Sequence, residues 1–309
     1  MFRSILVPLD GSTLAEHALP IAGSIARRAG AELQLVHVHV PEARYIEGKM
    51  VFNEVLDARL KEHQRVYLEE IAKKIRSGFP VTCVLLDGEV GQIAERLDSH
   101  IKTAEVDLVV MATHGRGMLA RLWLGSVTDK LVRQVEIPLV LIRPQEKKPD
   151  LTHEPVFRHI LIPLDGSALA EQILKYAVTL GKLMQADYTL FHVREPWIPV
   201  SYRPDEYFIE FQQLRIQKAQ AYLDEIAKRL RTREDGLTET IQVQTKIVMS
   251  HYPAVAILEE ANQHGIDLIA METHGHGGLI RLLIGSVADK VLRGTSIPIL
   301  LHRPHDKTP

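Results

Sequence analysis

The sequence lacks the features that mark secreted and membrane-spanning proteins. It contains a single cysteine, so no disulfide can form within the chain, and this fits a reducing compartment. No apolar run approaches the ~18 residues that a membrane helix needs. The amino terminus has no long apolar stretch followed by a cleavage site, which a secretory signal would show. We therefore expect a cytoplasmic protein with no membrane partner.

The sequence also lacks an excess of charge of either sign. Its 37 lysines and arginines balance 39 aspartates and glutamates, for a net charge of −2. In the charged segments 51–76 and 212–233 the two signs are mixed, which is typical of helices with one solvated face and speaks against a basic stripe. We expect no nucleic-acid partner.

The fifteen histidines do not cluster with cysteines or carboxylates at the spacing that a metal site requires. His37 and His39 lie on one face of an expected strand, but no ligand near them in the sequence completes a site. The sequence therefore predicts no metal site built from protein ligands. Three other histidines lie in charged, helix-like segments and are predicted to be solvated, namely His63, His100 and His264.

What the sequence does contain is an internal repeat. The block Ile-Leu-Val-Pro-Leu-Asp-Gly-Ser at 5–12 returns as Ile-Leu-Ile-Pro-Leu-Asp-Gly-Ser at 160–167. Blocks at 35–38, 113–115, 124–127 and 137–138 return in the same order at 190–193, 273–275, 284–287 and 297–298. The junction at 145–150 is polar and contains proline, as a linker does. We expect two domains of the same kind, at 1–145 and 155–305.

Within each copy, strands alternate with helices. In the first copy we expect strands at 5–9, 32–40, 81–86, 107–112 and 138–142, with helices after Ser12, at 51–76, at 92–102 and from Ser126, and Gly30 ending the first helix. This alternation predicts an α/β fold with a doubly wound, five-stranded parallel sheet in each copy. Two strand orders are common, 3-2-1-4-5 and 2-1-3-4-5, and only the first places strand 1 beside strand 4. The loops suited to chemistry follow strands 1 and 4, so we favour 3-2-1-4-5.

Some side chains can be assigned to the core, and some segments to the surface. Cys83 lies in an apolar run and is expected in the core. Prolines and aromatics between 197 and 211 indicate a loop near the second crevice. The last strand of each copy is expected at an edge of its sheet, where an apolar strand invites pairing. The segment 51–76 is expected to bury Val55, Leu60, Val66, Leu68, Ile71 and Ile75.

The loop after strand 4 has the composition of a phosphate cradle. Gly115 and Gly125 let the backbone approach a ligand, and Ser126 stands where a helix begins, so free N–H groups and the positive end of the helix dipole converge there. The segment is not a P-loop, because the Gly-x-x-x-x-Gly-Lys-Ser/Thr pattern is missing. Asp10 ends strand 1 at the same crevice. Its carboxylate either accepts from a ribose hydroxyl or caps the following helix together with Ser12.

Three motifs together resemble the universal stress protein family over nearly the whole of both copies. They are a strand with Pro-x-Asp-Gly-Ser, a strand ending in His-Val, and a Gly-x-x-Gly-x9-Gly-Ser/Thr region closing in Ile-Pro. The resemblance implies an adenine-nucleotide alpha-hydrolase-like fold and ATP binding, with Mg²⁺ carried by the nucleotide phosphates. It assigns Asp10 to the ribose, the Val38 backbone to the adenine, and the phosphates to Gly115, Gly125 and Ser126. The equivalents in the second copy are Asp165, Val193, Gly275, Gly285 and Ser286.

The first glycine of that last region is replaced in both copies. Ala112 adds only a methyl group, which narrows the ribose contact without closing it. Glu272 would place a carboxylate where the triphosphate lies, or would turn away to pair with His274 or Arg281. We therefore expect ATP in domain 1 more than in domain 2.

Other residues of these loops have two interpretations. His114 and His274 are turn residues or general bases, and the turn is favoured because no nucleophile with an adjacent base is readable. Arg116, Arg121 and Arg281 reach phosphates or lie in solvent. The resemblance also implies that the last strands associate within the chain, and it leaves open a homodimer.

Three functions are compatible with this sequence. The leading hypothesis is a stress-response regulator whose loops change with ATP occupancy and are read by an unidentified protein partner. The second is a slow ATPase or nucleotidyl-transfer enzyme built on the same crevice, and the lack of a readable catalytic residue weighs against it. The third is a scaffold or hydrophobic-ligand carrier with degenerate nucleotide sites, which the residues at 112 and 272 would suit.

Overall fold

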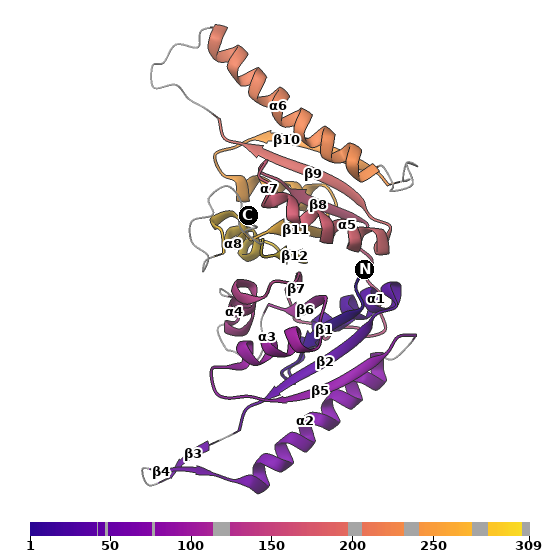
Figure 1. Ribbon diagram of the computed structural model, residues 1–309, viewed down its shortest axis with the longest axis vertical. Coiled ribbons are helices and arrows are strands. Elements are labelled where there is room, and N and C mark those ends of the chain that lie inside the picture. The colour runs from indigo at the N-terminus through magenta and orange to yellow at the C-terminus, as the bar shows by residue number, and fades with distance from the viewer. Residues whose placement is uncertain are drawn as a thin grey trace. The chain divides into compact units, whose positions relative to one another are not determined.

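The two sequence copies fold into two units, Met1–Val156 and Phe157–Pro309, with the same succession of main strands and helices (Figure 1). The computed structural model describes residues 1–41, 43–46, 49–75, 78–113, 124–196, 206–231, 241–273 and 284–304. Each unit is an α/β domain in which helices connect parallel strands, as the alternation in the sequence predicts.

The first unit has its strands in the predicted order. Its elements are β1 (Ser4–Pro8), the 3-10 helix η1 (Ala15–Ala18), α1 (Leu19–Ala29), β2 (Glu32–His39), β3 (Ala43–Ile46), β4 (Lys49–Phe52), α2 (Glu54–Ile75), β5 (Val81–Asp87), α3 (Ile93–Thr103), β6 (Leu108–Ala112), α4 (Ser126–Gln134) and β7 (Leu139–Ile142). Parallel pairing gives β5-β2-β1-β6-β7, which is the order 3-2-1-4-5. Strands β3 and β4 form a separate antiparallel hairpin.

The second unit repeats this arrangement. Its elements are β8 (His159–Pro163), η2 (Ala170–Gln172), α5 (Ile173–Met184), β9 (Asp187–Arg194), α6 (Glu206–Arg231), β10 (Val243–Met249), α7 (Pro253–Gln263), β11 (Leu268–Glu272), α8 (Ser286–Gly294) and β12 (Ile299–His302). Its parallel order is β10-β9-β8-β11-β12. Within each unit the last strand therefore ends its own row of strands.

Both faces of each sheet are covered by helices. In the first unit α1 and α2 lie on one face and α3 and α4 on the other, as right-handed crossovers require (Figure 1). Strand β1 is central and apolar on both faces, and Ile5, Leu6 and Val7 are fully buried. Burying such a side chain contributes about 1.5–3 kcal/mol, so the central strands anchor the fold.

A carboxylate ties the first strand to the fourth at their amino ends. Asp107 Oδ2, just before β6, accepts hydrogen bonds from the backbone N–H groups of Arg3 (2.7 Å) and Ser4 (3.2 Å) at the start of β1. In the second unit Asp267 accepts the same two bonds from the start of β8, at 2.7 Å and 3.1 Å. These contacts hold β1 against β6 in one register, and the loops that follow both strands consequently emerge at the same edge.

The predicted ends of the first helix are confirmed in part. Gly30 ends α1 in the left-handed conformation, with φ of 63°. The equivalent residue in the second unit is Gln185, with φ of 55°. Ser12 is not the cap of α1: its hydroxyl oxygen accepts the N–H of Ala15 at 3.2 Å, in the turn that leads into η1, and η1 precedes α1.

Several assignments of buried side chains and of loops that were made from sequence patterns are wrong. Val55 and Val66 are exposed, at 64% and 43%. Val55 lies in the amino-terminal part of α2, which extends away from the strands (Figure 1). Cys83 is exposed rather than buried. It lies on β5, the outermost strand of its unit, so its side chain has neighbours on one flank only. The hairpin β3–β4 was not expected, and residues 206–211 belong to helix α6 rather than to a loop.

The polar junction after β7 lies against the first unit. The Ser24 hydroxyl on α1 donates a hydrogen bond to the carbonyl oxygen of Pro155 at 2.6 Å. An ion pair joins Arg27, one turn later, to Glu154. The chain that follows the predicted linker at 145–150 is thus bonded to α1.

Two glycines give a paired test of α1. Gly30 has positive φ, where a Cβ is strained even though no heavy atom lies within 4 Å of it, so Gly30→Ala should lower the free energy of unfolding by about 1 kcal/mol. Gly23 lies inside the helix, and a Cβ there would meet Cζ of Phe79 at an ordinary 3.6 Å. Gly23→Ala should therefore raise the free energy of unfolding by roughly 0.5–1 kcal/mol. Urea denaturation measures both, and changes of the same sign would contradict this helix end.

Candidate functional site

The register of the sheet brings predicted ligand residues of the first unit into one row. Strand β1 pairs with β2 on one side and with β6 on the other. Continued past the end of β1, this register places Asp10 level with Val38 on one neighbour and with Thr113 on the other. Neighbouring strands lie about 4.8 Å apart, so the row from Val38 to Thr113 spans about 10 Å. That length suits a nucleoside lying across the carboxyl edge of the sheet.

Asp10 closes the turn that follows β1. Its Oδ1 accepts hydrogen bonds from the backbone N–H (2.9 Å) and the hydroxyl (2.6 Å) of Ser12. Gly11 between them has φ of 79°, a conformation that favours glycine. In the structure Asp10 thus forms a local turn with Ser12 rather than a helix cap, and the contact with ribose stays a prediction.

The helix after β6 begins at the predicted residue. The N–H of Gly125 donates to the carbonyl oxygen of Thr113 at 2.9 Å, and α4 starts at Ser126. Within the described part of the chain no side chain caps this start. The N–H groups of the first turn and the helix dipole therefore favour an anion beside the end of β6. Gly125 has φ of −58° and ψ of 146°, which any residue adopts, so conformation alone does not require glycine there.

The second unit repeats this geometry closely. Asp165 Oδ1 accepts from the N–H (2.9 Å) and the hydroxyl (2.6 Å) of Ser167. The N–H of Gly285 donates to the carbonyl oxygen of Thr273 at 2.7 Å. Helix α8 then begins at Ser286, where no side chain among the described residues provides a cap. The same backbone frame thus exists in both copies.

The remaining predicted residues divide into two groups. Val193 lies near the end of β9, half-buried, and continued register places it level with Asp165. Ala112 ends β6 and is buried. The other predicted loop residues lie outside the described residues, namely Gly115, Gly275, His114, His274, Arg116, Arg121 and Arg281.

A close neighbour of Val38 was missed from the sequence. Gly88, directly after β5, donates its N–H to the carbonyl oxygen of His39 at 2.8 Å. A Cβ on Gly88 would lie only 2.5 Å from Cγ1 of Val38, so the two segments meet this closely because residue 88 has no side chain. The second unit has Ser250 in this position, with its N–H bonded to the carbonyl oxygen of Arg194 at 2.9 Å. The only signal in the sequence was a glycine directly after a strand.

Glu272 does not point to the position expected of it. The Nδ1 atom of His302, on the adjacent strand β12, lies 2.9 Å and 3.0 Å from the two carboxyl oxygens. Each of these side chains is 2% exposed, and the ring of Tyr176 on α5 lies 4.5 Å from the His302 ring, centroid to centroid. The carboxyl group therefore lies on the face covered by α5. Among the described residues its partner is His302, and the expected partners His274 and Arg281 lie outside the described residues.

The first unit fills the same places with apolar side chains. Ala112 pairs with Ile142 in the sheet, as Glu272 pairs with His302. The repeat places Ile21 of α1 where the second unit has its tyrosine. In the second unit Glu272, His302 and Tyr176 thus form one cluster of polar side chains that contact one another.

The charge of Glu272 also differs from the expectation. Burial raises the pKa of Glu272 to about 9, so its pair with His302 holds a proton at neutral pH. A buried, protonated carboxyl group on the α5 face does not repel a triphosphate at the end of the sheet. The argument from Glu272 for a weaker second site therefore fails.

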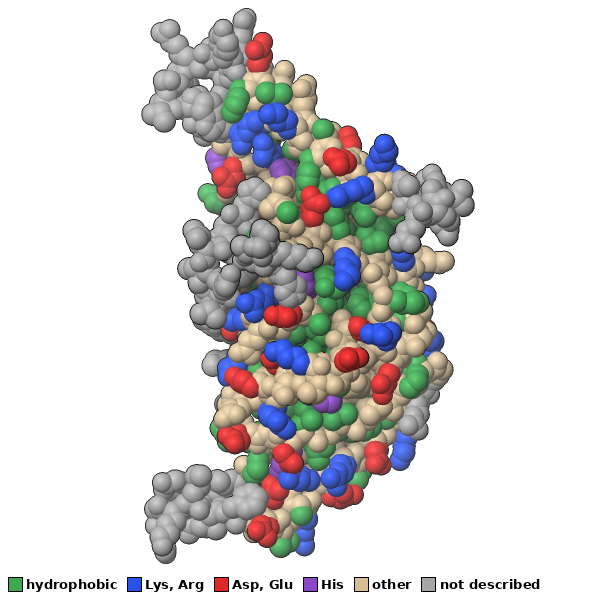
Figure 2. Space-filling view, in the orientation of Figure 1, with side chains coloured by type: hydrophobic (Ala, Val, Ile, Leu, Met, Phe, Trp, Pro, Cys, Tyr) green, Lys and Arg blue, Asp and Glu red, His purple; other side chains and the backbone are tan. Residues whose placement is uncertain are grey.

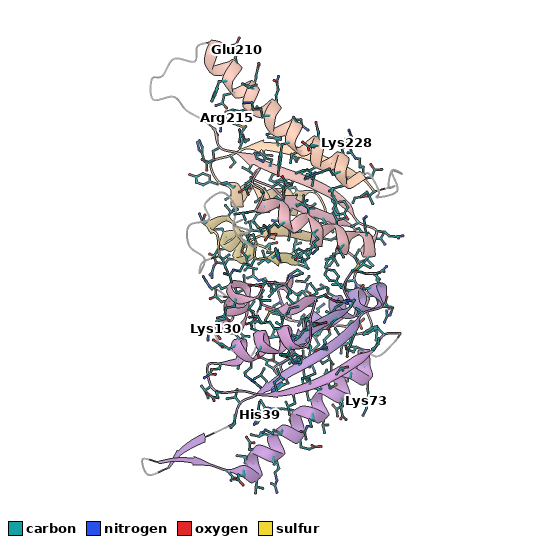
Figure 3. All side chains as sticks on the ribbon, in the orientation of Figure 1. His39, Lys73, Lys130, Glu210, Arg215 and Lys228 are labelled. Carbon is teal, nitrogen blue, oxygen red and sulfur yellow. The ribbon has the colours of Figure 1, made fainter. Side chains whose placement is uncertain are left out.

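Two histidines are more deeply embedded than their sequence context indicates. His39, labelled in Figure 3, is buried, with Nε2 2.7 Å from Asp57 Oδ1 and Nδ1 2.8 Å from Gln64 Oε1, both on α2. No carboxylate lies near His39 in the sequence, but the fold brings Asp57 beside it. His100 is half-buried rather than solvated, because its Nε2 bonds to Gln34 Oε1 at 2.9 Å, and burial lowers the pKa of His100. Among the described residues, no three or more His, Cys, Asp or Glu gather as a metal site.

The molecular surface carries mixed charge. On the face shown in Figure 2, acidic and basic side chains are interspersed, and no large area has a single sign. In the described part of the chain, no helix is both long enough and apolar enough to cross a membrane.

Comparison with known proteins decides the family. The model of the universal stress protein family matches residues 1–143 and 157–303, which is nearly all of both units. The chain belongs to the universal stress protein family. The resemblance seen in the three motifs is thereby confirmed for each copy, and so is the tandem arrangement.

Individual members show the same extent of similarity. A universal stress protein of Thermus aquaticus is 35% identical over 143 residues, which are 46% of this chain and 100% of that protein. One of Mycolicibacterium smegmatis is 26% identical over 303 residues, 97% of each chain. The crystal structure of a universal stress protein from Archaeoglobus fulgidus covers 97% of this chain and 98% of its own, with a TM-score of 0.67 and 20% identity. The last comparison confirms the fold.

The buried pair in the second unit predicts a pH dependence of stability. Glu272 has a pKa of about 9 in the folded protein against 4.5 ordinarily, so between these values the folded state binds a proton that the unfolded state lacks. The free energy of unfolding of this unit should therefore fall as pH rises from about 5 to 9, by up to ~1.4 kcal/mol per pH unit. Glu272→Gln should remove this slope, measured by hydrogen exchange of the β11 amides.

The matched control is Glu259→Gln, which changes an exposed glutamate on α7. It should keep the wild-type slope. If Glu272→Gln and wild type show the same pH dependence, the raised pKa is wrong.

Proposed function

We propose that the first unit binds an adenine nucleotide, ATP, across the carboxyl edge of its sheet. The observation that carries this proposal is the start of α4, which the bond from Gly125 to Thr113 anchors at the end of β6 and which no described side chain caps. An uncapped helix start favours a phosphate. The row from Val38 to Thr113 leads to this point over about the length of a nucleoside.

Each residue of the row has a separate task in this proposal. The backbone at Val38 contacts the adenine, where Gly88 leaves the strand ends close together. Asp10 accepts hydrogen bonds from the ribose, because its carboxylate stands between the two neighbouring strands. The N–H groups at Gly125 and Ser126 hold the phosphates. Mg²⁺ is held mainly by those phosphates, since the described residues contain no group of ligands for it.

We propose that the first unit is the stronger of two sites. The backbone frame at Asp165, Gly285 and Ser286 matches the first unit, so the second unit is the next candidate. The two differ at the adenine end. There the second unit has Ser250 in place of Gly88, so its strand end carries a side chain that the first unit lacks.

Within a stress-response family, we propose that nucleotide occupancy is the regulatory signal. Ser126 is exposed at the start of α4. A triphosphate bound there places negative charge on the molecular surface, where a protein partner can read it. This supports a regulatory binding protein in the cytoplasm.

Calorimetric titration of the full chain with adenosine, AMP, ADP and ATP tests the phosphate end. In the wild type, affinity should rise with each phosphate, because each adds contacts with the start of α4. Gly125→Val should weaken ATP binding by about tenfold or more while leaving adenosine binding little changed. The variant should fold, because valine adopts the φ and ψ of this residue without strain.

Gly285→Val is the matched control in the second unit. This variant should retain the tighter ATP binding, which we assign to the first unit. Loss of the tighter event in Gly285→Val, with Gly125→Val unaffected, would reverse the order of the two sites. ATP binding unchanged in both variants would overturn the proposal.

The ribose contact can be tested with one further pair. Asp10→Asn keeps an oxygen that can accept the two bonds from Ser12 but loses the charge that strengthens a bond to ribose. ATP should bind about tenfold more weakly to this variant. The wild type should also prefer ATP over 2′-deoxy-ATP, and Asp10→Asn should lose most of that preference. An equal preference in both proteins would remove Asp10 from the ribose site.

A further inference from the structure

The carboxyl end of β2 in the first unit carries a closed network of charges. His39 bonds to Asp57 at 2.7 Å, and Lys61 lies 3.4 Å from Asp57 and 2.8 Å from Asp87. The hydrogen bond from His39 lowers the pKa of Asp57, and the hydrogen bond with Asp87 raises the pKa of Lys61. His39 and Lys61 therefore each face a carboxylate from their own unit.

In the second unit the carboxylates of this network are missing. By the repeat, Arg194 replaces the histidine at the strand end, and Gln212 replaces the aspartate on the long helix. Ile216 stands in place of the lysine. Met249, which pairs with Arg194 in the sheet, stands in place of the second aspartate. Arg194 thus places a permanent positive charge at the strand end, where the second unit has neither of the two aspartates of the first unit.

A second cation has been added to the same place. Arg215 on α6 occupies the position that Leu60 holds on α2. Figure 3 labels Arg215 on α6, whose helix covers β9 and β10. Burial lowers the pKa of Arg194, and the positive charge of Arg215 lowers it further. Both nonetheless stay charged, because arginine does not lose its proton in proteins.

Both guanidinium groups have buried donors without an acceptor. Nε of Arg194 and Nη1 of Arg215 are shielded from solvent and have no hydrogen-bond partner among the described residues. Neither arginine forms an ion pair with a carboxylate in the described part of the chain. Arg215 also lies 5.9 Å from the ring centroid of Phe211, measured from Cζ, and this contact helps to orient it.

We propose that Arg194 and Arg215 form an oxyanion-binding site at the carboxyl end of β9. Two adjacent cations repel each other, and buried donors without acceptors cost free energy, so a bound anion relieves both. The planar N–H groups of guanidinium match the oxygens of phosphate and carboxylate. The ligand class is therefore a small molecule that carries a phosphate or carboxylate group. The site lies under α6 and is separate from the start of α8, which is two strands away.

Full-length protein labelled with ¹⁵N tests this directly. The arginine Nε–Hε signals are followed while inorganic phosphate replaces chloride at constant ionic strength. The signals of Arg194 and Arg215 should shift with saturation. Arg215→Leu, which introduces the residue of the first unit, should weaken this phosphate binding by about tenfold or more, as should Arg194→Gln.

Lys218→Gln is the control, because it removes an exposed positive charge from the same helix. It should bind phosphate like the wild type. Acetate titrated in the same way separates the two sources of oxyanion, and saturation by either one supports the site. If neither anion shifts the Arg194 signal, or if Arg215→Leu binds phosphate as the wild type does, the proposal is overturned.

Discussion

The geometry of this protein depends on the pairing of the first and fourth strands in each unit. Asp107 and Asp267 hold that pairing at the amino edge by accepting two backbone N–H groups each. Side chains alternate along a strand, so a slip of one residue would turn every side chain of β1 to the other face of the sheet. The same slip would move Asp10 out of the row that it shares with Val38. A contact at one edge of the sheet thus determines which residues meet at the other.

Much of the fold could be predicted because its determinants are local. Helical spacing, the glycine at position 30 and the apolar runs of the strands identified the elements to within a few residues. The strand order followed from asking which loops must meet, and the start of α4 at Ser126 followed from the glycine before it. The hairpin β3–β4 was missed, since no alternation of polar and apolar residues marks it.

The partners of buried polar groups could not be predicted, because they depend on how elements pack. Asp57 reaches His39 from a different helix, and Glu272 reaches His302 across 30 residues of chain. Neither partner could be identified from the sequence. Cys83 shows the opposite error, since an apolar run on the outermost strand of a unit is exposed. Propensity indicates that a strand forms, but the position of the strand in the sheet decides which of its side chains are buried.

The two copies show where a repeated domain can diverge. Their strand orders and turns agree, whereas polar residues have changed in groups that contact one another. Glu272, His302 and Tyr176 stand where the first unit has three apolar residues, and they contact one another, so the buried carboxyl group has a partner. At the end of β9 two arginines have no carboxylate partner among the described residues. A buried polar side chain is tolerated when the chain also supplies a polar partner for it. A buried polar side chain without such a partner is a reason to look for a ligand.

The segment that follows β7 has a practical consequence for anyone who wishes to study the halves separately. A cut at residue 145 falls in a polar stretch and looks harmless. It would nevertheless remove residues 146–156, of which Glu154 and Pro155 are bonded to α1. A fragment ending at 156 would retain these bonds, so the two fragments would differ in stability although neither loses a strand. The carboxyl-terminal boundary of the first unit therefore depends on contacts with α1, which lies far from this boundary in the sequence.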